Sequence, residues 1–437
     1  MLLMILMRAM MQMEEPKIRI DVIQDGQSIS AKLIQKYGLK GRDIGQSYDE
    51  ENERSISTCS FVGFVRRGDR LLISIPKHYM RLADFKRLSQ ERQLSHARMI
   101  MQTITKFYRS PEFSEYRNRE DVESDFALET FYRIYDYFSA YGLYKERRRL
   151  VHEGYQGRIS WKDTIRRSNK LIDGGNLIFA PFYILKNQEL ETLITQCMVF
   201  AINYTKQLFD DLIPLPDNSR IVIRGVDQNI LNNVQAVIGQ LYQIQSTIFK
   251  DIDKELVSNL IVFFEQVNDM TKDTRSFKDH SYSSLWETAV RRYLELHFAG
   301  IDEERDEMLY DRSQIFHHDF SKLTEFGYDQ KHKGRALAPD LYHLDRKNNC
   351  QYIFDAKYYS SLNDLNHKQL VYHFLFANRA AKTYDALIMP YEGKTRTQIH
   401  VQINPAWLPD DSKYLKDVKI YLNQLNMIDV LDSFLNE

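Results

Sequence analysis

The chain reads Ala338-Pro339-Asp340 and, further on, Tyr352-Ile353-Phe354-Asp355-Ala356-Lys357, with fourteen residues between Asp340 and Asp355. The second stretch is an apolar strand that ends in a charged triplet. Side chains alternate along a strand, so Asp355 and Lys357 share one face while Ala356 points to the other. A polar turn at residues 346–349 separates the two segments, which predicts adjacent antiparallel strands with Asp340 beside Asp355.

Two neighbouring carboxylates repel each other unless a cation lies between them. Oxygen ligands suit Mg²⁺, which keeps several of its waters and accepts phosphate oxygens, and Mn²⁺ is expected to substitute for it. The pattern predicts a metal held by Asp340, Asp355 and the Ala356 carbonyl. Lys357 is then placed to orient or deprotonate a water and to stabilise the charge on phosphorus. The predicted reaction is hydrolysis of a phosphodiester.

Other Asp-x-Lys triplets occur in the chain, including those at residues 329–331, 345–347, 411–413 and 417–419. None of these ends an apolar strand. The alternative interpretation of Asp340, Asp355 and Lys357 is a group of surface charges at the mouth of a hairpin. An aspartate beside a buried strand is unfavourable unless it has a task, and this favours the catalytic interpretation.

The order of these residues resembles the PD-(D/E)xK nuclease superfamily, whose motif is matched by Pro339-Asp340 and Asp355-Ala356-Lys357. The resemblance implies an αβββαβ core with a further acid on a preceding helix. Glu287 is the matching acid, and it would complete or support the ligand shell of the metal. The resemblance also implies a glutamine on the helix after the lysine strand, which Gln369 matches. Tyr372 follows Gln369 by three positions where related nucleases often show four, so this position departs from the pattern.

Over most of its length the chain looks most like McrC-type nuclease subunits and the LlaJI restriction endonuclease family. The added marks are Phe61-Val62-Gly63-Phe64-Val65, Leu71-Leu72-Ile73-Ser74-Ile75-Pro76-Lys77 and Gly157-Arg158-Ile159-Ser160-Trp161. The resemblance implies a cytoplasmic subunit of an antiphage restriction system. Such a subunit cuts double-stranded DNA together with a McrB-like AAA+ GTPase that translocates DNA. Cleavage of both strands by single metal sites also favours two nuclease subunits per event.

The chain is consistent with needing such a partner, because it has no P-loop of its own. Its Gly-Lys-Thr sequence lies at residues 393–395, and the first glycine of a P-loop would have to stand where Ile388 stands. Two other functions remain open at this point. One is an assembly or activator subunit of an AAA+ NTPase whose nuclease fold is not catalytic. The other is a stand-alone DNA repair or transposon nuclease.

Composition indicates a soluble globular protein, because 43% of the residues are hydrophobic and 27% are charged. The net charge of −1 gives no global field that would attract a polyanion. The chain is predicted to be an α+β, multi-domain protein. We expect a β-containing, partner-docking domain at residues 17–115, a mainly helical middle region at 116–274, and a nuclease domain at 275–437.

Local patterns predict the individual elements. Two β-rich runs at residues 61–65 and 71–75 flank the turn Arg67-Gly68-Asp69, which predicts a hairpin, and an amphipathic helix over 82–108 is expected to pack on it. Few breakers interrupt residues 231–267, which predicts one or two long helices there. Further expected elements are helices at 282–297 and 363–383 and strands at 340–344, 351–356 and 386–389.

Residues 145–170 hold nine Lys or Arg side chains against three acids. Two interpretations are open: a face that binds phosphates, or a solvated helix surface whose charge is balanced by acids elsewhere.

Two features bear on the compartment. Three distant cysteines, Cys59, Cys197 and Cys350, predict a reducing, intracellular environment. The apolar segment at residues 1–13 is too short to span a membrane, so we expect an amphipathic leader or a true start at Met13.

Overall fold

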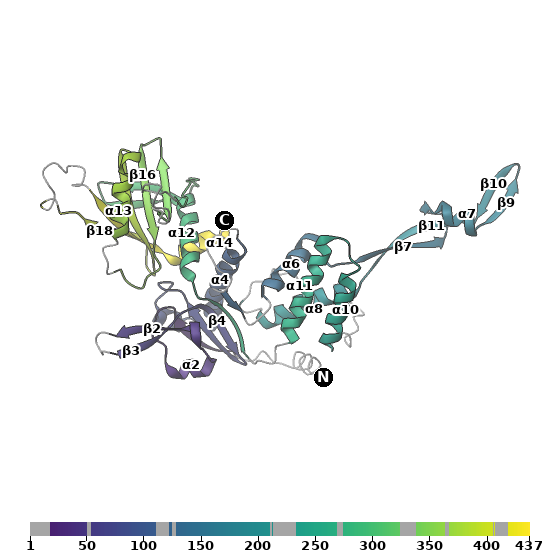
Figure 1. Ribbon diagram of the computed structural model, residues 1–437, viewed down its shortest axis with the longest axis horizontal. Helices are drawn as coiled ribbons and strands as arrows, with labels where there is room; N and C mark the ends of the chain where they lie inside the picture. The colour runs from purple at the N-terminus through teal and green to yellow at the C-terminus, as the bar shows by residue number, and fades with distance from the viewer. Residues whose placement is uncertain are drawn as a thin grey trace, which may run out of the picture. The chain divides into compact units, whose positions relative to one another are not determined.

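The computed structural model describes residues 18–49, 54–110, 122–124, 128–209, 212, 233–268, 274–323, 338–362, 367–404, 406 and 418–437. These residues fall into two compact units (Figure 1). The terminal unit takes its described residues chiefly from 16–125 and 273–437, and the middle unit takes them from 126–210 and 215–272. Segment 1–13 and the prolines at 214 and 216 lie outside the described residues.

The first sheet of the terminal unit has five strands in the order β1-β5-β4-β12-β6. Their bounds are β1 Arg19–Gln24, β4 Val62–Arg67, β5 Arg70–Ile75, β6 Val122–Ser124 and β12 Thr274–Asp279. β4 and β5 are antiparallel and form the predicted hairpin, with Gly68 at a φ of 61° in the turn. β12 pairs with β4, so a strand from residues 274–279 completes the sheet that the N-terminal segment begins.

The helix expected over residues 82–108 is divided into α3 (Leu82–Arg87) and α4 (Gln90–Arg109). The division occurs because the Ser89 side chain accepts a hydrogen bond from the Arg92 amide and caps the second helix. α4 packs against β4 and β5, as the sequence predicts. The remaining described elements of this segment are α2 Ala31–Tyr37, the 3₁₀ turn η1 Gly41–Asp43, β2 Ile44–Asp49 and β3 Arg54–Cys59.

The second sheet of the terminal unit has the order β15-β16-β17-β19-β18. Its strands are β15 Leu341–Asp345, β16 Cys350–Ala356, β17 Lys382–Tyr391, β18 Arg396–Gln402 and β19 Lys419–Asn426. β16 is buried along its whole length, which is why its sequence is nearly continuous in apolar residues. It pairs antiparallel with β15 and parallel with β17. The two strands predicted at 340–344 and 351–356 are therefore confirmed within a residue.

Helices flank this second sheet. The helix predicted at 282–297 is confirmed as α12 (Tyr282–His297). The helix predicted over 363–383 is shorter in the described residues, where α13 covers His367–Phe376 and the 3₁₀ turn η3 covers Ala377–Arg379. That prediction is wrong at its C-terminal end, because residues from Lys382 onward pair with β16 as part of β17.

The described residues between α12 and α13 form four strands, and of these β15 and β16 join the second sheet. The other two, β13 (Phe298–Asp302) and β14 (Glu307–Tyr310), pair with each other in a two-stranded sheet.

The segments expected as separate N-terminal and C-terminal domains lie in one compact unit. Besides β12, three helices join them, because α4 and α12 both contact α14 (Met427–Asn436) and each other (Figure 1). The Lys106 ammonium on α4 also donates to the Phe434 carbonyl oxygen at 2.7 Å.

The middle unit combines helices with strands. Its helices α6 (Leu128–Tyr141), α8 (Leu193–Phe209), α10 (Val234–Gln245) and α11 (Asp251–Asn268) pack together, and the last two confirm the expected long helices. The expectation of a mainly helical region is wrong for residues 146–190, which we call the arm. The arm contains β7 Glu146–Glu153, β8 Arg158–Ile159, α7 Trp161–Arg167, β9 Asn169–Asp173, β10 Asn176–Ala180 and β11 Tyr183–Leu190.

The arm is built from strand pairs that short-range periodicity does not reveal. β9 and β10 meet at Gly174-Gly175, where both residues have positive φ values of 58° and 85° and suit a tight hairpin turn. β11 pairs antiparallel with β7, so Glu146 faces Leu190 across the ladder. Such a partner lies far along the chain and outside any local pattern.

The nine basic side chains of segment 145–170 therefore do not lie on one helix: five are on strands β7, β8 and β9, and three are on α7. Acids offset part of its charge: the Arg147 Nε lies 3.4 Å from a Glu189 carboxylate oxygen, and the Arg167 Nε lies 3.6 Å from Asp163. These pairs are solvated and weak. Phosphate binding by this segment stays a prediction.

Among the helices that the structure describes, none is long and apolar enough to cross a membrane.

Candidate active site

The hairpin of β15 and β16 brings the two aspartates of the sequence motif together. Its ladder pairs Leu341 with Phe354, and the next position places Asp340 opposite Asp355. The two carboxyl groups share a hydrogen bond. Burial, this hydrogen bond and the negative charge of Asp355 raise the pKa of Asp340 well above its ordinary value. The expectation that Asp340 lies beside Asp355 is therefore met by the structure.

Lys357 joins the same cluster. Its Nζ lies 2.5 Å from a carboxylate oxygen of Asp355, and the two side chains are only 17% and 5% exposed. Burial by itself would lower the pKa of Lys357, but the nearby Asp355 and Asp340 charges outweigh burial and raise it. The Lys357 amide donates to the Ile388 carbonyl oxygen at 2.8 Å, so strand pairing continues one residue beyond β16. This pairing fixes the backbone from which the ammonium projects.

Glu287 lies on α12 and faces Asp340 across a small cavity. The cavity has a volume of about 10 Å³, room for roughly one water-sized occupant. It is lined by Glu287, Thr288, Arg291, Lys322, Asp340 and Leu341. The Glu287 charge also contributes to the raised pKa of Asp340, after the larger effects of burial and Asp355. The Glu287 and Asp340 side chains therefore line the same small cavity.

The donor set fits a hard divalent cation. Two carboxylates in contact, a third at the adjoining cavity and the strand end at Ala356 supply oxygen ligands only, which Mg²⁺ prefers. Within the described part of the chain, no three His, Cys, Asp or Glu side chains converge closely enough to enclose a metal by themselves.

Gln369 lies on α13, which packs against β16 and β17. Its buried Nε2 donates to the Ile353 carbonyl oxygen, and it lies 3.4 Å from a carboxylate oxygen of Asp385 on β17. These contacts hold α13 against β16 and β17. No contact of Gln369 with Asp355 or Lys357 appears among its described hydrogen bonds. In this structure Gln369 is a positioning residue for the strand.

Tyr372, whose spacing departs from the family pattern, lies in the core one turn after Gln369. It packs with Tyr342, Ile353 and Phe376. Its pKa is raised by burial, although a hydrogen bond with the Ala338 backbone acts against that rise. That hydrogen bond anchors the segment that leads into Asp340.

Sequence reasoning missed Asp385. This aspartate is fully buried on β17, where its carboxylate contacts the His373 ring and the Gln369 amide. Burial raises the pKa of Asp385 despite the neighbouring His373. The available signal was an acid next to the apolar run 386–389, which requires a polar partner when it is buried.

The sequence of the chain is similar to a known protein family. A protein family model described as LlaJI restriction endonuclease matches residues 61–373, more than half of the chain. No curated protein matches the chain.

Two solved structures from Thermococcus gammatolerans are similar to it. One is a refined half-complex from a tetradecameric assembly of McrB AAA+ hexamers with bound McrC. The match is 12% identical, covers 95% of this chain and 98% of that chain, and has a TM-score of 0.35. The other is a cryo-EM structure of the McrBC complex, 14% identical, covering 62% of this chain and 88% of that chain, with a TM-score of 0.22. These TM-scores are too low to establish a common fold.

Proposed function

Because this chain belongs to the LlaJI restriction endonuclease family, we propose that it is the DNA-cleaving subunit of a restriction system. The proposed reaction is Mg²⁺-dependent hydrolysis of phosphodiester bonds in double-stranded DNA. The observation that carries the proposal is the convergence of Asp340, Asp355 and Lys357 at the end of one hairpin. Membership of the family supports a role in a restriction system, and these three side chains support the proposed hydrolysis of phosphodiester bonds.

In this proposal the carboxylates of Asp340 and Asp355 and the Ala356 carbonyl would hold the metal, and Glu287 would complete or support its shell. Bound Mg²⁺, or Mn²⁺ in its place, would supply Lewis-acid polarisation of a phosphate oxygen and a water of lowered pKa. Lys357 stays charged because its pKa is raised by Asp355 and Asp340 against the effect of burial. Its ammonium then orients the attacking water and stabilises negative charge on the phosphate. Gln369 and Tyr372 hold the backbone that carries these groups.

We further propose that residues 275–437 form a PD-(D/E)xK nuclease domain. Supporting features are the helix α12 with Glu287, the hairpin that ends in the motif residues, and the crossover of α13 to the parallel strand β17. In a parallel crossover the helix covers one face of the sheet, and here α13 contributes Gln369 from that face.

The proposed partner is a McrB-like AAA+ GTPase that moves DNA. Support comes from the family and from the sequence, which contains no P-loop to bind a nucleotide by itself. The proposed docking region is residues 17–115. Two nuclease subunits are proposed to act together on the two strands.

The test is to mix the purified full-length chain with the product of a neighbouring AAA+ reading frame, GTP and Mg²⁺, on modified and unmodified plasmid. Lys357→Ala should lower the cleavage rate by about 10²-fold or more and leave DNA affinity unchanged. The matched control is Lys347→Ala, because Lys347 ends an Asp-x-Lys triplet in the exposed turn of the same hairpin. It should cut at the wild-type rate.

The outcomes separate the rival functions. Cleavage by the chain alone, without partner or GTP, would favour a stand-alone nuclease. Stimulation of the partner's GTPase with no cleavage by the wild-type chain would favour an assembly subunit. Wild-type cleavage by Lys357→Ala would refute the role given to this lysine.

A further inference from the structure

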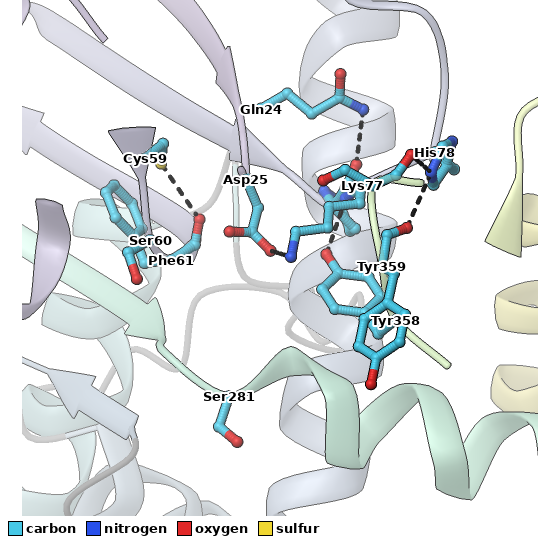
Figure 2. Close-up of polar contacts among 12 residues, drawn as sticks. Gln24, Asp25, Cys59, Ser60, Phe61, Lys77, His78, Ser281, Tyr358 and Tyr359 are labelled. Atoms are coloured by element: carbon cyan, nitrogen blue, oxygen red, sulfur yellow. Dashed lines mark hydrogen bonds and ion pairs between the residues drawn. The ribbon is translucent and has the colours of Figure 1, made fainter. Parts of the chain in front are cut away.

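Tyr358 follows Lys357 directly and points away from the catalytic cluster into a different set of contacts. It is only 7% exposed, and its hydroxyl accepts a hydrogen bond at 2.8 Å from the amide of Lys77, a residue 281 positions away in the sequence. The same hydroxyl hydrogen-bonds the Asp25 carboxylate. The Lys77 ammonium lies 4.9 Å from the centre of the Tyr358 ring (Figure 2). The Tyr358 side chain is therefore held by the N-terminal segment and by the ring of Tyr282 on α12, whose centre lies 5.4 Å from its own.

The His78 side chain binds the backbone of Tyr359 and Ser360, the two residues that follow Tyr358. Its Nε2 lies 3.1 Å from the carbonyl oxygens of both Tyr359 and Ser360, and because carbonyl oxygens only accept, Nε2 is the donor. Its Nδ1 lies 3.0 Å from a Glu392 carboxylate oxygen, just beyond β17. The His78 backbone has a φ of 56°, a left-handed conformation that side chains other than glycine rarely adopt. Strained backbone of this kind persists where surrounding contacts require it.

The loop that carries Lys77 and His78 is itself bonded to the first sheet. It comprises residues 76–80, between β5 and α3. The Gln24 amide at the end of β1 donates to the Pro76 carbonyl oxygen at 2.9 Å and contacts the Met80 carbonyl oxygen at 3.4 Å. The Lys77 ammonium also lies 3.9 Å from the Asp25 carboxylate, which follows β1 directly. Loop 76–80 is therefore bonded to the end of β1 and continuous in sequence with β5.

Lys357 is thus fixed from two directions. Before it, β16 and the Ile388 carbonyl set its backbone within the second sheet. After it, Tyr358 to Ser360 are bound by the loop of the first sheet. The position of the Lys357 ammonium depends on both attachments, and a displacement of about 1 Å in a catalytic group is enough to slow a reaction by about a hundredfold.

We propose that Tyr358 and His78 are positioning residues for Lys357, and that loop 76–80 transmits the state of the first sheet to the cleavage centre. This proposal rests on the proposed function, since it assumes that Lys357 takes part in cleavage. A partner that moves β1 or β5 would thereby change the cleavage rate without touching the metal ligands.

The test compares two deletions of a single buried hydroxyl in the full-length chain. Tyr358→Phe removes the hydroxyl that binds Lys77 and Asp25. The matched control is Tyr421→Phe on β19 of the same second sheet, which removes a buried tyrosine's hydroxyl 3.0 Å from an Asp306 carboxylate oxygen. Each variant is assayed for DNA cleavage at saturating DNA, for DNA affinity with Ca²⁺ in place of Mg²⁺, and for acylation of Lys357 by an N-hydroxysuccinimide ester, followed by peptide mass spectrometry.

Tyr358→Phe should lower the cleavage rate by about tenfold to a hundredfold at unchanged DNA affinity. It should also raise the acylation rate of Lys357, because a side chain released from Asp355 is more accessible to the reagent than one that is 17% exposed. Tyr421→Phe should match the wild-type chain in cleavage rate, DNA affinity and Lys357 acylation. A purely structural role of Tyr358 would lower the amount of folded protein and leave the acylation of Lys357 in folded molecules unchanged.

Wild-type cleavage and wild-type Lys357 acylation in Tyr358→Phe would overturn the proposal. If the wild-type chain cuts no DNA under any condition, the proposed function fails, and the acylation rates alone decide whether Tyr358 positions Lys357. If Tyr358→Phe does not fold, His78→Gln replaces it, because this half-buried side chain keeps one donor while losing the contact with Glu392. The same rise in Lys357 acylation is expected, and its absence would overturn the proposal.

Discussion

Replacing Asp340 by asparagine tests whether two carboxylates oppose each other in the metal-free protein. Burial, the hydrogen bond with Asp355 and the Asp355 charge raise the pKa of Asp340 from 3.8 to about 8. An acid whose pKa is raised on folding stabilises the fold at low pH, and that stabilisation is lost as the pH rises through the folded-state pKa. The metal-free wild-type protein should therefore lose stability between about pH 4 and about pH 8, and Asp340→Asn should not.

The full pKa rise corresponds to about 6 kcal/mol, an upper limit. Because the two carboxyl groups titrate as a pair and the site relaxes, we expect Asp340→Asn to gain about 2–3 kcal/mol over the wild type across this range. The measurement is urea unfolding with a chelator present, at about pH 5 and about pH 9. Added Mg²⁺ should restore the wild-type protein at the higher pH and leave Asp340→Asn unchanged, since a bound cation relieves the repulsion.

The control is Asp345→Asn at the other end of β15. Burial alone would raise the pKa of Asp345, but hydrogen bonds from Asn348 and Lys347 outweigh it and lower that pKa. The contribution of Asp345 to stability therefore changes only in acid, at and below its unfolded-state pKa. The difference in the free energy of unfolding between Asp345→Asn and the wild type should stay constant between about pH 5 and about pH 9. Equal changes in the free energy of unfolding for the two variants would refute carboxylate repulsion at Asp340.

Two further predictions concern the metal and the first sheet. Mg²⁺ binding near neutral pH should release up to about one proton, because a cation lowers the raised pKa of Asp340. Calorimetry in buffers of different ionisation enthalpy measures the number of protons released. Binding without proton release would contradict the prediction. Gly63→Ala would place a Cβ 2.1 Å from the Phe277 carbonyl oxygen and should cost about 3 kcal/mol or more. Gly142→Ala, also at positive φ but in open space, should cost about 1–2 kcal/mol, and equal losses in thermal unfolding would exclude the steric explanation.

Much of the candidate site could be predicted because its parts lie close in the sequence. Asp340 and Asp355 belong to one hairpin, so a short polar turn and strand alternation suffice to place them together. α12 shows a continuous helical repeat of apolar residues, which predicted its bounds, while Glu287 on it was indicated by the resemblance to the nuclease superfamily. Gln369 was placed on the correct helix, but the structure shows that it supports the strand and does not contact the motif carboxylates in its described hydrogen bonds.

The sequence by itself determined the local elements and the adjacency of the motif residues, because turns, alternation and helical repeats report interactions between near neighbours. Only the tertiary structure decided which distant segments pair. It placed β12 in the sheet begun by β4, turned the arm into strands by pairing Glu146 with Leu190, and brought Lys77 to Tyr358. The stability of a strand depends on the partner beside it, and a partner far along the chain leaves no trace in the local pattern.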